Sequence, residues 1–83
     1  MGENQEIKIR ESLQAVFREV FDDDGLLLSE ELTAEGYEAW DSLLHIQLVA
    51  AAEKKFRVKF TTREILKLKN AEDFVRLIAG KLS

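Results

Sequence analysis

Residues 40–56 read WDSLLHIQLVAAAEKKF, and this stretch decides the fold. Asp41 and Ser42 are both good helix N-caps, and no proline interrupts the residues that follow. We therefore predict a helix that opens at Asp41 or Ser42 and continues to about Phe56. Helical spacing places one stripe of this helix toward a core, and its members are His45, Leu48, Val49, Ala52 and Phe56.

The first ten residues of this helix are apolar almost all the way round. Outside the core stripe, the apolar positions are Leu43, Leu44, Ile46, Ala50 and Ala51. A helix in so small a protein cannot be buried on every side, so we expect some of these residues to be exposed beside Ser42. An exposed apolar patch usually marks a contact surface. The alternative is that the leucine-bearing loop before the helix covers the patch.

An amphipathic pattern precedes this stretch. It predicts a helix from about Glu6 to Phe21, with an apolar stripe of Ile9, Leu13, Val16, Phe17 and Val20. Three aspartates and a glycine at 22–25 end that helix. Residues 25–40 then form a long connection, with a short turn of helix at 29–33. We expect it to be pinned to the core by Leu26, Leu27, Leu28 and Leu32.

Two further helices follow residue 56. A short one begins near Thr61 or Thr62 and carries Ile65, Leu66 and Leu68. The last is capped by Asn70 with Asp73 three residues on, and its inner face carries Phe74, Leu77, Ile78 and Leu82. Residues 57–60 alternate like a strand, but a single strand would have no partner. We predict an all-α fold: a small four-helix bundle, with three main helices, one short helix and a long loop between helices 1 and 2.

Composition narrows the class of protein. The 83 residues predict one domain, 1–83. Cysteine is absent and the N-terminus has no apolar signal core, so we expect a cytoplasmic protein without disulfides. No stretch approaches the roughly twenty apolar residues that span a bilayer. The net charge of −4 divides into −9 for residues 1–41 and +5 for residues 42–83, and we expect the halves to balance each other rather than to bind nucleic acid.

A few single residues could carry chemistry. A hydroxyl at Ser42 would lie beside the positive end of a helix dipole, which makes it a candidate attachment point for a phosphate-linked prosthetic group. Ser42 and His45 could be imagined as half of a hydrolase site, but no G-x-S-x-G motif is present, which favours a structural histidine. The acids at 22–24 lack the spacing of a calcium loop, so we expect no metal site. Tyr37 and Trp40 are expected to anchor the loop.

Asp41-Ser42-Leu43 opening an apolar helix, followed by a short helix and a capped fourth, resembles an acyl carrier protein over nearly the whole chain. The resemblance implies a carrier, not an enzyme, whose Ser42 receives 4′-phosphopantetheine from coenzyme A through a dedicated transferase. It implies that transferase and partner recognition use Asp41, Leu43, Leu44, Ile46, Gln47, Ala50 and Glu53. It implies a cavity for the acyl chain, which we expect to be lined by Leu48, Ala52, Phe56 and Leu68.

The chain departs from the usual carrier of fatty-acid synthesis. Such carriers have a strongly acidic second helix, whereas the corresponding places here hold Leu44, Gln47, Lys54 and Lys55, with only Glu53 retained. A tryptophan directly before the Asp-Ser-Leu motif, here Trp40, resembles the pattern of carriers from dedicated biosynthetic clusters. We therefore predict a specialised, freestanding, monomeric carrier of fatty-acid, lipid, polyketide or related biosynthesis, served by acyl-loading and acyl-transfer enzymes. The alternatives are an aminoacyl or peptidyl carrier, or a helical protein- or DNA-interaction domain.

Overall fold

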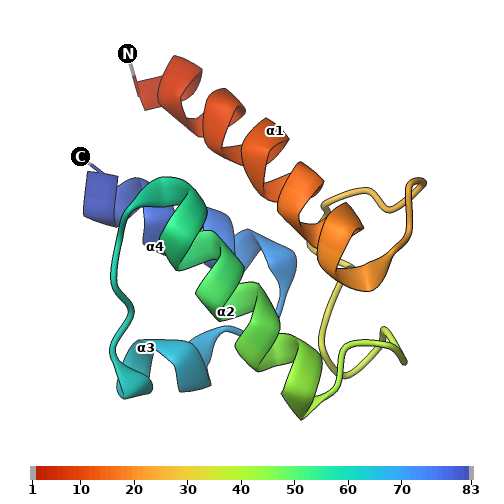
Figure 1. The fold of residues 1–83 in the computed structure, drawn as a ribbon. Coiled ribbons are helices and arrows are strands. Elements are labelled where there is room, and N and C mark those ends of the chain that lie inside the picture. The colour runs from red at the N-terminus through yellow and green to blue at the C-terminus, as the bar shows by residue number, and fades with distance from the viewer. Residues whose placement is uncertain (1, 83) are drawn as a thin grey trace.

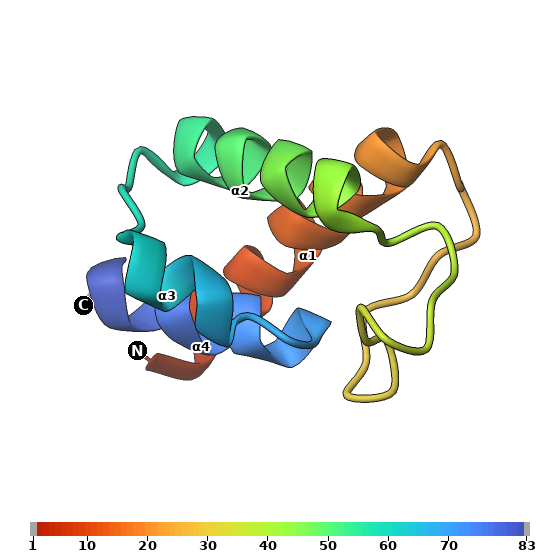
Figure 2. The same cartoon turned by 90° about the horizontal axis from the view of Figure 1, so that it is seen from below.

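The computed structural model describes residues 2–82, and the side chains from Glu6 onward. Its helices are α1 (Gly2–Phe21), α2 (Ser42–Phe56), α3 (Thr62–Lys67) and α4 (Ala71–Leu82), with no strand in residues 2–82. α2 and α4 pack on α1 and run opposite to it, while α3 lies on the side away from α1 (Figures 1 and 2). Residues 22–41 form the long loop from α1 to α2. The predicted all-α four-helix fold is confirmed.

Local hydrogen bonds explain why the helices begin where they do. The Asp41 carboxylate accepts the Leu44 N–H at 2.9 Å, so Asp41 and not Ser42 is the N-cap of α2. At α3, Thr61 and Glu64 form a reciprocal capping box. At α4, the Asn70 side chain accepts the Asp73 N–H at 2.8 Å. The start predicted for the third helix and the cap predicted for the fourth are therefore confirmed.

Several boundaries and faces differ from the prediction. α1 begins at Gly2 rather than near Glu6. Residues 29–33 form a turn and not a helix, because the Leu32 carbonyl accepts the Ala71 N–H at 2.9 Å and so draws the chain alongside α4. Thr33 and Asn70 form an isolated antiparallel bridge there. Two leucines expected to face the core do not: Leu27 is 66% exposed and Leu82 is 40% exposed.

An aromatic cluster joins the loop to the helices. The ring of Phe17 meets those of Trp40 and Phe74 edge-on, each with a centroid separation of 5.4 Å. Tyr37 packs against Phe21 and donates its hydroxyl proton to Asp23 at 3.0 Å. Burial and this hydrogen bond both raise the pKa of Tyr37. Trp40 and Tyr37 therefore anchor the loop, as predicted, and fix the approach to α2.

A charged pair that the sequence reading missed holds α4 to α1. Glu72 is only 7% exposed, and both of its carboxylate oxygens accept hydrogen bonds from the guanidinium of Arg10. Arg10 also bonds Glu6 one turn earlier, at 3.2 Å. The bonds from Arg10 hold the pKa of Glu72 below its usual range, although burial opposes this. The pair therefore links the two helices only while Glu72 is ionised.

Glu72→Gln is expected to lower the melting temperature at neutral pH and to flatten its decline in acid. A carboxyl with a lowered folded-state pKa stabilises the fold above its unfolded pKa, about 4.3, and that stabilisation is lost as the pH falls through the lowered value. Thermal unfolding by circular dichroism at several pH values measures this, with the exposed Glu11→Gln as control. If the melting temperature falls as steeply with decreasing pH in Glu72→Gln as in the wild type, Glu72 contributes nothing to that fall.

Candidate functional site

Ser42 is the first residue of α2, and it is exposed. Because Asp41 supplies the cap, the Ser42 hydroxyl takes part in no hydrogen bond within residues 2–82. It lies at the positive end of a helix of 15 residues, where backbone N–H groups and the helix dipole favour a phosphate. A free, exposed hydroxyl in this position fits a phosphodiester-linked group and needs no rearrangement of the fold.

A largely apolar groove of about 750 Å³ borders Ser42. Loop residues 33–35 form one side, the segment from Trp40 to Ile46 forms another, and residues 65–69 close it. The sequence reading missed the loop residues and Ile65, since they are far from Ser42 along the chain. The bridge between Thr33 and Asn70 brings the loop against the end of α3. Its volume falls in the range of pockets that hold small organic ligands.

Three of the residues predicted to line an acyl cavity, Leu48, Ala52 and Leu68, belong to the buried core, and Phe56 packs against it. Leu68 is in the groove beside Ser42. Leu48 and Ala52 are fully buried in the core, with exposed fractions of 0%. Phe56 is half-buried and ends α2, about 21 Å along the helix axis from Ser42. The structure therefore brings only Leu68 to Ser42, and the role of the other three residues stays a prediction.

The apolar patch beside Ser42 is exposed, as expected. Leu43 and Ile46 are each 64% exposed, so the loop does not cover them. Leu66 on α3 is 75% exposed and joins this side of the molecule, which the sequence reading did not foresee. Gln47 and Ala50 continue the exposed face of α2, while Leu44 is half-buried.

Glu53 has a different role from the other residues assigned to partner recognition. It is half-buried, and its carboxylate accepts the Phe60 N–H at 2.8 Å. Its backbone carbonyl accepts the N–H groups of Arg57 and Val58. Glu53 therefore ties the α2–α3 connection to the end of α2 through one carboxylate oxygen, and its part in partner recognition stays a prediction.

His45 is a structural residue. Its Nδ1 lies 3.0 Å from the Trp40 indole nitrogen, and its Nε2 lies 3.1 Å from the Ile65 carbonyl oxygen. The indole can only donate and the carbonyl can only accept, so Nδ1 accepts, Nε2 carries the proton and the ring is neutral. Both ring nitrogens are occupied, so neither can take a proton from Ser42. The interpretation of Ser42 and His45 as a hydrolase pair is wrong.

His45→Ala is expected to reduce the free energy of unfolding by about 1–3 kcal/mol, because it leaves the buried Trp40 N–H without an acceptor. Chemical denaturation measures the loss. Treatment with a serine-directed phosphonate is expected to label Ser42 in neither protein. Labelling of Ser42 that disappears in His45→Ala would instead show an activated serine.

Within residues 2–82, no group of three side chains is placed to hold a metal ion. None of the helices in this range is long and apolar enough to cross a membrane.

Comparison with known proteins identifies the family. No protein-family model matches the chain, and no curated protein matches it. Among solved structures, it is similar to the solution NMR structure of the holo acyl carrier protein from Geobacter metallireducens, with a TM-score of 0.81 and 41% sequence identity. The match covers 88% of this chain and 84% of that one. Likeness of sequence and fold over this share of both chains shows common descent, and the chain belongs to the acyl carrier protein family.

Proposed function

We propose that this protein carries acyl intermediates as thioesters on a 4′-phosphopantetheine arm attached to Ser42. The observation that carries the proposal is the exposed Ser42 hydroxyl, which has no hydrogen bond within residues 2–82 and opens a helix beside an apolar groove. The similar protein from Geobacter metallireducens is described as a holo acyl carrier protein, which supports the same modification here. The protein itself is a carrier, and its partner enzymes perform the chemistry.

The residues around Ser42 fit such an arm. The N-terminus of α2 would hold the phosphate, and the groove between the loop and α3 would receive the apolar part of the arm and its cargo. When attached, the arm supplies a thiol, which this chain lacks because it has no cysteine. Trp40 and His45 keep the start of α2 against the loop and α3, so they position the groove and take no part in the chemistry.

The exposed face of α2 is the proposed contact surface for the transferase and for acyl-transfer enzymes. Leu43 and Ile46 flank Ser42 on this face, and Gln47 and Ala50 continue it. Asp41 is exposed next to the serine and remains a candidate contact for the transferase, although its carboxylate also caps α2. The first turn of α2 holds no acidic residue, which favours a specialised carrier over one that serves general fatty-acid synthesis.

Incubation with coenzyme A, magnesium and a broad-specificity phosphopantetheinyl transferase tests the proposal. Intact mass spectrometry is expected to show one phosphopantetheine adduct, and peptide fragmentation is expected to place it on Ser42. The absence of an adduct, or an adduct on another residue, would reject the proposed function. Loading the modified protein with acyl donors and, separately, with amino acids and adenylating enzymes then distinguishes an acyl carrier from an aminoacyl or peptidyl carrier.

A further inference from the structure

The C-terminal end of α2 and the segment after it carry four exposed cations, Lys54, Lys55, Arg57 and Lys59, which we call the cationic cluster. No member of the cluster forms an ion pair with a described side chain, those of residues 6–82. Three other cations of the fold do, since Arg10 pairs with Glu6 and Glu72, Arg76 with Asp73 and Lys81 with Glu64. The cluster is therefore positive charge that no described side chain meets in a direct ion pair.

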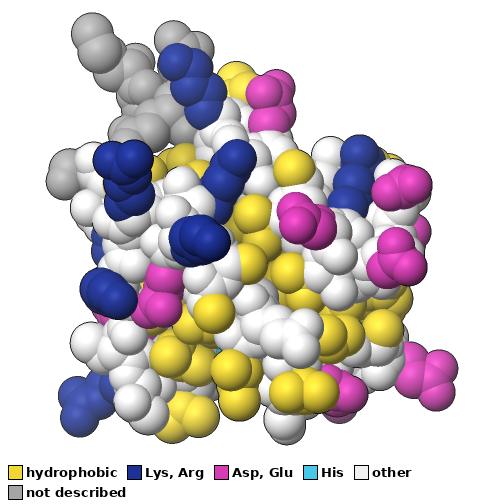
Figure 3. Space-filling model, in the orientation of Figure 1, with side chains coloured by type: hydrophobic (Ala, Val, Ile, Leu, Met, Phe, Trp, Pro, Cys, Tyr) yellow, Lys and Arg dark blue, Asp and Glu magenta, His cyan; other side chains and the backbone are white. Residues whose placement is uncertain are grey.

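Among the described side chains, those of residues 6–82, no direct ion pair joins an acid of the first half to a base of the second. Glu19 of the first half approaches the cluster, since it lines one groove together with Lys54, Lys55 and Arg57. Balance between the two halves therefore stays a prediction. In Figure 3, Lys and Arg gather on the left, where Figure 1 shows the C-terminal end of α2, and most acidic side chains lie to the right. The acidic loop joins the opposite end of α2, and the length of the helix, about 20 Å, separates the two charges.

Arg57 occupies a backbone conformation that favours glycine. Its φ is 57° and its ψ is 46°, in the left-handed region, where it forms the C-cap of α2. Glycine is the usual residue at such a helix end, because a side chain there costs about 1 kcal/mol or more. The Arg57 side chain is exposed and forms no ion pair within residues 2–82. A cation thus occupies a position where glycine would have the lower conformational energy.

The helix dipole accounts for only part of the cluster. Lys54 and Lys55 lie in the last turn of α2, where the negative end of a helix favours cations. Arg57 is the C-cap and also lies near this end, whereas Lys59 lies two residues beyond it. Among these cations lies one carboxylate, that of Glu53, which accepts the Phe60 N–H and makes no direct ion pair with them among the described side chains.

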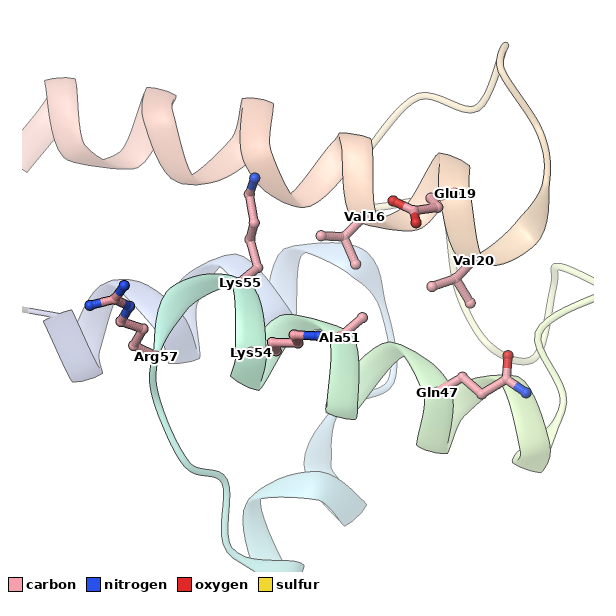
Figure 4. A pocket seen from close by; sticks show the side chains of 8 residues that line it. All are labelled: Val16, Glu19, Val20, Gln47, Ala51, Lys54, Lys55 and Arg57. Atoms are coloured by element: carbon pink, nitrogen blue, oxygen red, sulfur yellow. The ribbon is translucent and has the colours of Figure 1, made fainter.

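The cluster is continuous with the exposed face of α2 that begins at Ser42. A groove of about 650 Å³ between α1 and α2 has Lys54, Lys55 and Arg57 at one end and Gln47 toward the other (Figure 4). Val16 from α1 and Ala51 from α2 point into it, and Glu19 is the acid on its rim. One side of α2 therefore changes from apolar beside Ser42 to cationic about 18 Å further along the helix axis.

We propose that the cationic cluster docks on an acidic patch of the partner enzymes that act on the group carried by Ser42. The inference rests on the proposed function and extends it. Such a partner presents an apolar surface at the opening of its active site and carboxylates about 18 Å away. The charges are reversed relative to the usual carriers, in which an acidic helix docks on a basic patch of the enzyme. A protein patch fits better than a polyanion such as DNA or an anionic membrane, because the net charge of −4 and the acidic loop repel an extended negative surface.

In the test, a soluble acidic peptide composed of Glu and Leu is titrated into the full chain. Binding is followed by the NMR chemical shifts of the protein's backbone amides. The cluster variant is Lys55→Gln and Arg57→Gln together. The matched control is Lys8→Gln and Arg63→Gln, two exposed cations that also lack ion pairs among the described side chains and lie outside the groove beside Ser42, so both variants have the same net charge. Duplex DNA and anionic phospholipid vesicles are titrated in parallel.

We expect peptide binding to shift the amides of residues 54–59, to weaken with added salt, and to fall about tenfold in the cluster variant but little in the control. An equal loss in both variants, no shift at 54–59, or tighter binding of DNA or vesicles through these residues would overturn the proposal. Transferase loading of Ser42 is measured on every variant. Failure of that loading would reject the proposed function, whereas normal loading without peptide binding would reject only the acidic partner.

Discussion

Ser42→Ala is expected to abolish attachment of phosphopantetheine while leaving the fold intact. The hydroxyl is the only group that residue 42 offers to a transferase, so the loss of loading should be complete. The stability should change by less than about 0.5 kcal/mol, because Asp41 rather than Ser42 caps α2 and the serine is exposed. Intact mass after incubation with transferase and coenzyme A, together with a thermal melt, measures both quantities in one preparation.

Two controls make this result specific. Thr62→Ala removes an exposed hydroxyl from the first position of α3, the same place in a different helix, and should load as the wild type does. Asp41→Ala removes the cap of α2 and should reduce the free energy of unfolding by about 1 kcal/mol. If Ser42→Ala unfolds or still accepts the arm, Ser42 is not the attachment point proposed here.

Phe74→Ala is expected to destabilise the protein by about 3–5 kcal/mol, more than His45→Ala or Asp41→Ala does. Phe74 on α4 is fully buried, and its ring meets those of Phe17 and Trp40. Its removal opens a cavity where α1, α4 and the loop meet. A domain of this size has a total stability of about 4–12 kcal/mol, so the variant should lose a large part of it.

Urea denaturation followed by far-UV circular dichroism measures this loss. Leu66→Ala is the matched control, since Leu66 is 75% exposed, and should change the stability by less than about 0.5 kcal/mol. Phe74→Leu keeps most of the buried volume and should lose less than Phe74→Ala. Equal losses for Phe74→Ala and Leu66→Ala would mean that the aromatic cluster does not hold the loop to the helices.

The helices could be predicted because the forces that form them are local. Apolar spacing marks α1 and α2, and side chains three residues apart form the caps at Asp41, Thr61 and Asn70. The turn at 29–33 could not be predicted, since it depends on the pairing of Leu32 with Ala71, a residue of the distant helix α4. Hydrogen bonds to residues 69–71 overrode the helical preference of residues 29–33.

The burial of Glu72 could not be predicted from the sequence either. Nothing near Glu72 in the sequence distinguishes it from an exposed acid in the first turn of a helix. Its burial follows from the packing of α4 on α1, which places it opposite Arg10. A charged residue can be buried only with such a partner, and the partner lies 62 positions away.

The sequence by itself determined the attachment point proposed for this carrier. Asp41-Ser42-Leu43 at the start of an apolar helix locates Ser42, because a helix cap and a helix dipole depend on neighbouring residues alone. The tertiary structure decided the surroundings of that serine. Packing of the loop and α3 against α2 formed the groove and occupied both nitrogens of His45. These features join residues far apart in the chain, so only the fold could bring them together.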